Sequence, residues 1–347
     1  MKYRKAIVNG MKLSLVIMIL LTPIFVVSTQ AAPSLSKITT SKGKSFDATP
    51  ANIQVALNSL NGAGDVWLPP KTFSLTASIK IPYSGVKLHG YMSATYGYTV
   101  LNFNNKGKIT ASNKDNIFLD SFKIEGGIIE IILGDNTYLK NIQIQYALQG
   151  NSGAFRFIVP AGTVYNLNVE SCSTYKTYSH GFVINSYAPY KSCKIDGVNF
   201  KYLEARWAGW NYAGKSHGNY STGINIAENY CGSILTVRNA NIYKCKAEYC
   251  WESGFHMELK PTKYNVVYTE CTAQYNGQKK KAGINTGGIG VTYCAGFLIS
   301  TSGVKLVKCI SNYNTGWGYR GTLQPILVSC TGKGNGLPLY TTGCVLK

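Results

Sequence analysis

The string Tyr268-Thr-Glu-Cys271, an apolar residue, two variable residues and a cysteine, is one of eight related strings along this chain. The others are Leu119-Asp-Ser-Phe122, Leu139-Lys-Asn-Ile142, Val164-Tyr-Asn-Leu167, Ile195-Asp-Gly-Val198, Ile242-Tyr-Lys-Cys245, Leu306-Val-Lys-Cys309 and Leu327-Val-Ser-Cys330. Their last residues lie 20, 25, 31, 47, 26, 38 and 21 residues apart. A short basal period with irregular insertions is typical of a parallel β-solenoid, because each coil keeps its strands and grows at its loops.

Two further columns support this register. A tyrosine recurs four residues after the strings, with Ser171 interrupting the run, at Tyr146, Tyr202, Tyr249, Tyr275 and Tyr313. Later in most coils a second strand begins with glycine, as in Gly181-Phe-Val-Ile184, Gly223-Ile-Asn-Ile226, Gly254-Phe-His-Met257, Gly296-Phe-Leu-Ile299 and Gly316-Trp-Gly-Tyr319. Alternation predicts that the first and third residues after each glycine point inward. A β-sandwich of unrelated strands is the alternative, but sandwiches rarely preserve a column over so many units.

The N-terminal region predicts export. Residues 1–31 combine a basic start, an apolar run from Leu13 to Val27 and a small-residue end, which is the pattern of a secretory signal peptide. The apolar run is shorter than the roughly 20 residues that span a bilayer. Residues 32–46, rich in Ser, Thr and Lys, are expected to be a linker, and residues 47–347 one domain. We therefore expect a secreted or cell-surface protein with no transmembrane span after signal removal.

The domain is expected to begin with a short helix. Thr49 is suited to the N-cap and Pro50 to the first helical position, and Asn61-Gly62 stops the helix. One face would carry Ile53, Ala56, Leu57 and Leu60. Such a helix would cover the open end of a solenoid core.

The stretch from Ile53 to Leu101, with "GAGDVWLPPKTFSLTASIKIP", "GVKLHGY" and "YTVL", resembles the entry region of the pectin-lyase-like right-handed parallel β-helix superfamily. The later coils are similar to its generic β-helix repeats, so the resemblance covers nearly all of residues 47–335. It implies an all-β fold, a single-stranded right-handed parallel β-helix with an N-terminal capping helix. It does not specify an activity, because the superfamily includes lyases, hydrolases, epimerases, tailspikes and non-catalytic surface proteins.

The composition indicates an acidic partner. The formal net charge is +20, and removal of residues 1–31 would lower it to about +16 because four basic residues and no acidic ones are lost. On an exported protein this excess favours an acidic polysaccharide or cell-surface glycan, and makes a nucleic-acid partner unexpected. The alternative is that a lysine-rich surface only maintains solubility.

Ten cysteines lie between Cys172 and Cys344. Four of them end strings, so neighbouring coils would hold Cys245 beside Cys271 and Cys309 beside Cys330 at a separation a disulfide can bridge. An inward ladder of free thiols is the other reading. No paired spacing typical of zinc occurs, so we expect no metal.

Ionisable residues alternate on one glycine-led strand. His256, Glu258 and Lys260 lie between Phe255, Met257 and Leu259, so all three would leave the outer face. Stacking the strands predicts one outward column at Val183, Asn225, His256, Leu298 and Gly318, joined by Arg156, and a second at Asn185, Ala227, Glu258, Ser300 and Arg320. A base beside an acid suits proton abstraction or glycosidic cleavage. The alternative is an ordinary exterior strand with a cross-coil ion pair.

The longest coil, between Val198 and Cys245, carries an aromatic and basic insertion. Candidate substrate-binding residues there are Arg206, Trp207, Trp210, Tyr212, Lys215, His217 and Asn225. Aromatic rings pack on sugars, and Arg and Lys hold carboxylates. The insertion could instead fold over the wall and shield it.

These patterns favour an enzyme on an acidic polysaccharide, and a lyase above a hydrolase or epimerase. We expect His256, Glu258, Lys260 and Arg320 to be catalytic, with His256 transferring the proton. No cofactor is expected, and calcium is unsupported because carboxylates are few and not clustered. The alternative is a non-catalytic glycan-binding or cell-surface structural protein.

Overall fold

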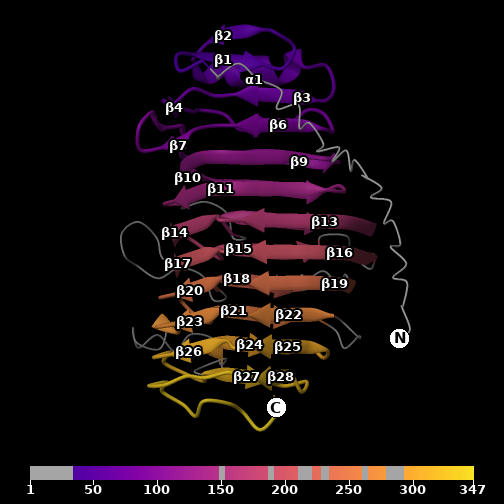
Figure 1. The fold of residues 1–347 in the computed structure, drawn as a ribbon, viewed down its shortest axis with the longest axis vertical. Helices are drawn as coiled ribbons and strands as arrows, with labels where there is room; N and C mark the ends of the chain where they lie inside the picture. Colours follow the sequence, from indigo (N-terminus) through magenta and orange to yellow (C-terminus); the bar gives the residue numbers. More distant parts are fainter. Residues whose placement is uncertain are drawn as a thin grey trace, which may run out of the picture. The chain divides into compact units, whose positions relative to one another are not determined.

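The computed structural model describes residues 34–147, 153–186, 191–209, 221–227, 234–259, 265–278 and 293–347. Residues 1–31, the predicted signal peptide, therefore lie outside the described part. Within the unit Pro33–Lys347, strands of successive coils pair in parallel and form three ladders (Figure 1). The predicted parallel β-helix is confirmed by this pairing.

Each ladder takes one strand, or part of a long strand, from each coil. The first ladder consists of β3 (Gly64–Trp67), β6 (Val86–His89), β10 (Phe118–Leu133), β11 (Thr137–Gln145), β13 (Gly162–Glu170), β16 (Ser192–Lys201), β19 (Ile234–Tyr243), β22 (Val266–Thr269), β25 (Val304–Val307), β28 (Ile326–Val328) and β29 (Val345–Leu346). The second consists of β4 (Thr72–Ser74), β9 (Val100–Lys114), β10, β11, β14 (Ser173–Thr177), β17 (Glu204–Ala208), β20 (Lys246–Glu248), β23 (Thr272–Gln274) and β26 (Ile310–Asn312). The third consists of β5 (Ile79–Lys80), β9, β10, β12 (Phe155–Val159), β15 (Phe182–Ser186), β18 (Ile224–Ala227), β21 (Phe255–Glu258), β24 (Phe297–Ile299) and β27 (Tyr319–Gly321).

The helix α1 (Pro50–Ser59) lies at the first-coil end of the ladders (Figure 1). It buries the predicted face of Ile53, Ala56 and Leu57, although Thr49 makes no side-chain capping bond. The expected linker is wrong in part, because β1 (Lys37–Thr40) pairs with β3 and with β2 (Ser45–Asp47). Burial of Ile38 and Thr40 anchors this segment to the first coil. A small antiparallel pair, β7 (Met92–Ser93) and β8 (Gly97–Tyr98), forms a separate two-stranded sheet.

A left-handed backbone position precedes the inward residue that ends each repeated string. This position has a φ between 50° and 62° in eight successive coils, at Ser121, Asn141, Ser171, Tyr202, Lys244, Glu270, Lys308 and Ser329. The inward column is therefore Phe122, Ile142, Cys172, Leu203, Cys245, Cys271, Cys309 and Cys330. The expectation that Leu167 and Val198 belong to this column is wrong. They follow a second left-handed turn, at Asn166 and Gly197, within the long strands β13 and β16.

The same correction moves the tyrosine column. Counting four residues from the corrected strings gives a second set of left-handed positions, at Gly126, Tyr146, Lys176, Trp207, Tyr249, Tyr275, Tyr313 and Gly334. Tyr202 belongs to the other turn, and Ser171 is no interruption. Trp207 therefore occupies a structural position in this column.

The cysteine column is an inward ladder of thiols. Cys245, Cys271 and Cys309 are at most 1% exposed, and Cys330 is half-buried against the core. Each thiol donates to the carbonyl that opens the string of the preceding coil, as Cys271 does to Ile242 at 3.3 Å. None of the nine described cysteines is in a disulfide, so the disulfide alternative is wrong for these residues.

The glycine-led strands form the third ladder, and their glycines are required by close stacking. A Cβ on Gly181 would lie 2.7 Å from the carbonyl oxygen of Gly223, and one on Gly254 would lie 2.9 Å from that of Gly296. The last coil was misaligned by two residues. Gly318, not Gly316, accepts the bond from Phe297 N–H, which places Arg320 opposite Leu298.

Candidate functional site

The outward row of the third ladder contains two of the four candidate catalytic residues, His256 and Arg320. In register order it consists of Glu130, Arg156, Val183, Asn225, His256, Leu298 and Arg320. Phe255 and Met257, on either side of His256, belong to the hydrophobic core, whereas His256 does not. The predicted outward direction is therefore confirmed, including Arg156, but Arg320 joins the row of His256 rather than that of Glu258.

The row is more buried than an ordinary exterior strand. Asn225 is 7% exposed and His256 is 6% exposed. Val183 and Leu298 are buried as well, although neither belongs to the hydrophobic core cluster. The expectation of a solvent-facing column is wrong at these positions, so the site is a covered one.

His256 and Glu258 lie side by side on β21. Nε2 of His256 is 3.2 Å from Oε2 of Glu258, and the side chain of Glu258 is 55% exposed. Nε2 of His256 is buried, and its contact with Glu258 does not have the geometry of a hydrogen bond. His256 contributes most to lowering the pKa of Glu258, and the charge of Arg320 lowers it further. Glu258 is therefore a carboxylate at neutral pH that can orient the imidazole.

Tyr293 connects the two ends of this cluster. Its ring lies 6.4 Å from that of His256 at 70°, and the guanidinium of Arg320 lies 5.1 Å from its centroid. Sequence reasoning missed Tyr293, which follows a long insertion and has no counterpart in the repeated columns. A cation held over an aromatic ring at this distance is favourable.

His180 is the second imidazole of the site and was not assigned a role from the sequence. Its Nδ1 accepts a hydrogen bond from Thr222 N–H at 3.1 Å, and its Nε2 lies 3.4 Å from the Asn225 amide. Burial, with a smaller effect from the charge of His256, lowers the pKa of His180 to about 3. His180 is therefore neutral over the physiological range.

An ion-pair cluster begins the row. Glu130 contacts Arg156 at 2.5 Å and Lys108 at 2.6 Å. Burial alone would raise the pKa of Glu130, but these two cations lower it. Arg156 is thus neutralised by Glu130, which leaves Arg320 as the cation nearest the His256 pair in the described row.

The structure separates Arg206 and Trp207 from this site. Both lie on β17 in the second ladder, where Arg206 contacts Glu248 at 2.8 Å and Glu204 at 3.2 Å. Trp207 stacks on Tyr249. Trp207 therefore has a structural role, and the face of its ring that Tyr249 covers cannot pack on a sugar.

The other candidates of the long coil lie outside the described residues. They are Trp210, Tyr212, Lys215 and His217, together with Lys260 beyond β21. The structure therefore brings together four of the named candidates, Asn225, His256, Glu258 and Arg320, and adds His180 and Tyr293.

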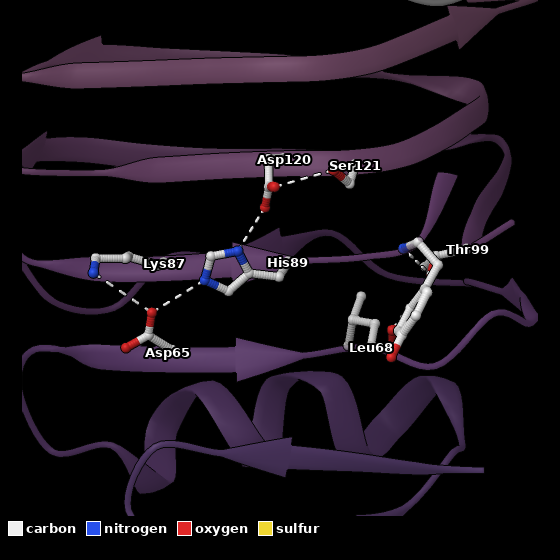
Figure 2. A network of polar contacts seen from close by, with 8 residues as sticks. Asp65, Leu68, Lys87, His89, Thr99, Asp120 and Ser121 are labelled. Atoms are coloured by element: carbon white, nitrogen blue, oxygen red, sulfur yellow. Dashed lines mark hydrogen bonds and ion pairs between the residues drawn. The ribbon is translucent and has the colours of Figure 1, made fainter. Parts of the chain in front are cut away.

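A second polar cluster lies on the first ladder, near the first coil. The ring of His89 bridges two carboxylates, with Nδ1 2.6 Å from Asp120 and Nε2 3.1 Å from Asp65 (Figure 2). Lys87 lies 3.6 Å from Asp65, and Trp67 stacks on His89 with 14° between the rings. Because both ring nitrogens are occupied, this cluster is a cross-coil ion network.

Within the described ranges, no group of three or more His, Cys, Asp or Glu side chains is arranged to hold a metal ion. A search of the same ranges for a helix long and apolar enough to cross a membrane also finds none. The polar side chains described around His256 on the third ladder are those of His180, Asn225, Glu258, Tyr293 and Arg320.

Comparisons with known proteins add little to this description. No protein-family model matches the chain, and no curated protein matches it. Among solved structures, it is similar to the catalytic domain of a GH87 alpha-1,3-glucanase in complex with nigerose. The identity is 8%, the TM-score is 0.29, and the match covers 81% of this chain and 63% of that one. Such a remote likeness assigns no function here, and the chain spans less than two thirds of that domain.

Proposed function

We propose that the protein is exported and acts on an acidic polysaccharide as a lyase, with the active site on the outer face of β18, β21 and β27. The observation that carries the proposal is the contact of Glu258 with His256, which lies in a covered row that also holds Arg320. The positive net charge supports a polyanionic substrate.

In this reaction His256 takes the proton from the carbon next to the uronate carboxylate. Arg320 pairs with that carboxylate and stabilises the developing negative charge. The bond to the leaving sugar oxygen then breaks, a carbon–carbon double bond forms, the leaving oxygen takes a proton from water, and His256 returns its proton to the solvent. Glu258 orients the imidazole, which is the part a carboxylate plays beside a proton-transferring histidine.

The test is incubation with pectate, alginate, hyaluronan and chondroitin while the absorbance of the unsaturated product is followed. We expect turnover of at least one glycan and its loss in His256→Ala and Arg320→Ala. Lys305→Ala is the matched control, because Lys305 is an exposed cation on β25 of the first ladder. Full activity of His256→Ala, or no product from any of these glycans, would overturn the assignment.

A second function is favoured by the burial of His256. A proton-transfer group must reach its substrate, and 6% exposure leaves little of the ring accessible. Glycan binding without turnover would need no such access. It predicts retention on an acidic glycan column that weakens with salt, with no product formed.

A further inference from the structure

One early coil carries an insertion that the ladders do not use. Ten residues, 90–99, join β6 to β9. At the corresponding turn of the next coil the register leaves only two residues, Ser121 and Phe122. The insertion contains β7 and β8, which form a hairpin separate from the ladders. Insertions on a rigid scaffold are common places for binding residues.

The base of this hairpin is held by hydrogen bonds to the coil. Thr99 is fully buried, and its hydroxyl accepts the backbone N–H of Tyr91 at 2.9 Å and donates to the carbonyl of Pro69 at 2.9 Å. The backbone N–H of Thr99 donates in turn to the carbonyl of Tyr91 at 2.9 Å. Gly90 allows the chain to leave the coil, because a Cβ there would lie 2.6 Å from the carbonyl oxygen of Ser121. The hairpin is therefore anchored, and little ordering is needed when a ligand binds.

The hairpin presents aromatic rings to solvent. Tyr96 is 59% exposed, the highest value among the large hydrophobic residues that the structure describes, and Tyr98 is 41% exposed. Met92 lies opposite Tyr98 in the strand pair, so these two side chains share one face. Packing within the described chain leaves both tyrosine rings largely in water, so a partner would bury apolar area that the fold does not.

A lysine adds positive charge to the same surface. Nζ of Lys123, on β10, lies 3.6 Å from the centroid of the Tyr98 ring. No carboxylate among the described residues forms an ion pair with Lys123, including Glu125 two residues along the strand. The ammonium is thus held at the hairpin by the ring, and its charge is not neutralised. Aromatic rings pack on sugars, and a lysine holds a carboxylate or sulfate, so together they suit an acidic sugar.

We propose that the hairpin 91–98 and Lys123 form a surface that binds an acidic glycan chain. Tyr96 and Tyr98 pack on sugar rings, and Lys123 pairs with a carboxylate or sulfate. His256 lies on the third ladder, five coils further along the chain. One strand spacing per coil places it about 24 Å away along the solenoid. The surface therefore holds the polymer apart from the candidate active site, and the proposal does not depend on the lyase assignment.

The test is calorimetric titration with pectate, alginate, hyaluronan and chondroitin sulfate, in a His256→Ala background so that no glycan is cleaved. We expect at least one of them to bind, and replacement of both Tyr96 and Tyr98 by Ala to weaken this binding about tenfold or more. Tyr165→Ala is the matched control, because Tyr165 is 49% exposed on β13 of the first ladder, away from the hairpin. Equal affinities of the hairpin variant and its parent would overturn the proposal, and so would binding of none of the four glycans.

The charge of Lys123 is tested separately. We expect Lys123→Gln to weaken binding about threefold at low salt and to match its parent at high salt. Lys305→Gln, an exposed cation on β25, is the control and should leave the affinity unchanged. Equal affinities of Lys123→Gln and its parent at low salt, or equally tight binding of uncharged dextran, would contradict an acidic partner. Equal melting temperatures of all variants would verify that each remains folded.

Discussion

The rings of Trp207 and Tyr249 lie flat against each other, with centroids 4.7 Å apart and 10° between their planes. The stack continues through Tyr275 and Tyr313 at 5.0 and 5.4 Å. All four residues have positive φ, so a strained backbone position is repeated along the second ladder. The stacking offsets a conformation that non-glycine residues rarely adopt.

The aromatic stack should be cooperative. We expect Tyr275→Ala to lower the free energy of unfolding by about 2 kcal/mol, because it removes the contacts with both Tyr249 and Tyr313. Urea unfolding measures this change. Lys176→Ala is the control, since Lys176 occupies the same turn position without a stacked ring, and it should change stability by only a few tenths of a kcal/mol. Similar losses in both variants would mean that the turn and not the stack stabilises the column.

The glycine column should tolerate no side chain. A Cβ on Gly254 would lie 2.8 Å from Nδ2 of Asn276 and 2.9 Å from the carbonyl oxygen of Gly296. We expect Gly254→Ala to cost about 3 kcal/mol or more, because these atoms belong to the packed interior and the backbone. Gly43→Ala, where φ is 74° but no atom lies within 4 Å, should cost only about 1 kcal/mol. Thermal unfolding compares the two, and an unchanged melting temperature for Gly254→Ala would contradict the coil spacing.

The thiol ladder should resist alkylation in the folded protein. Burial raises the pKa of the Cys172 thiol to about 12. Burial also raises the pKa of Cys271, which is fully buried. We expect half-buried Cys330 to react first and Cys271 only on unfolding, as mass spectrometry of the labelled peptides would show. Rapid labelling of Cys271 would mean that the register is shifted by one residue.

Cys271→Ser tests the same ladder thermodynamically. The hydroxyl can take over the bond to the Ile242 carbonyl, so we expect a loss of about 1 kcal/mol. Cys344→Ser, at the half-buried end of the chain, should cost less. The opposite order in denaturant unfolding would argue against an inward Cys271.

The His89 network should make stability depend on pH. Burial alone would lower the pKa of His89, but the hydrogen bonds to Asp120 and Asp65 raise it above 6.5. The unfolded chain has the ordinary value, so the contribution is complete below about pH 6.5 and is lost as the pH rises through the folded value. Wild type should therefore be more stable than His89→Gln, and this difference in stability should be larger at pH 6 than at pH 9. A difference that grows with pH would contradict a protonated bridge.

The coils followed from the sequence because strand alternation and the recurring glycine are local signals. The register of the coils ending at Cys172 and Leu203 did not, because each of these coils contains two left-handed turns that are followed by an apolar residue or a cysteine. The turns lie at Asn166 and Ser171 in one coil, and at Gly197 and Tyr202 in the next. Hydrophobicity does not show which of the two turns aligns with the turn of the next coil. The stacking of Trp207 on Tyr249 does show it.

The site was accessible from sequence only in part. Alternation placed His256 and Glu258 on the outer face, but it cannot state what covers that face, so the burial of His256 was not foreseen. His180 and Tyr293 act through contacts between segments far apart in the chain, and no local pattern marks them. The charge of Arg206 suggested a substrate contact, whereas a neighbouring coil supplies its partner, Glu248.

The glycine column has a consequence for how such a chain can change over generations. Every glycine of that column, from Gly181 to Gly318, faces a carbonyl of the following coil or of the C-terminal segment. Substitution at these positions is therefore blocked, although glycine has no side chain that could take part in a reaction. Segments joining the ladders have no such restriction and are free to lengthen. New activities on this scaffold would therefore arise by lengthening of these connecting segments, beside a glycine column that cannot itself vary.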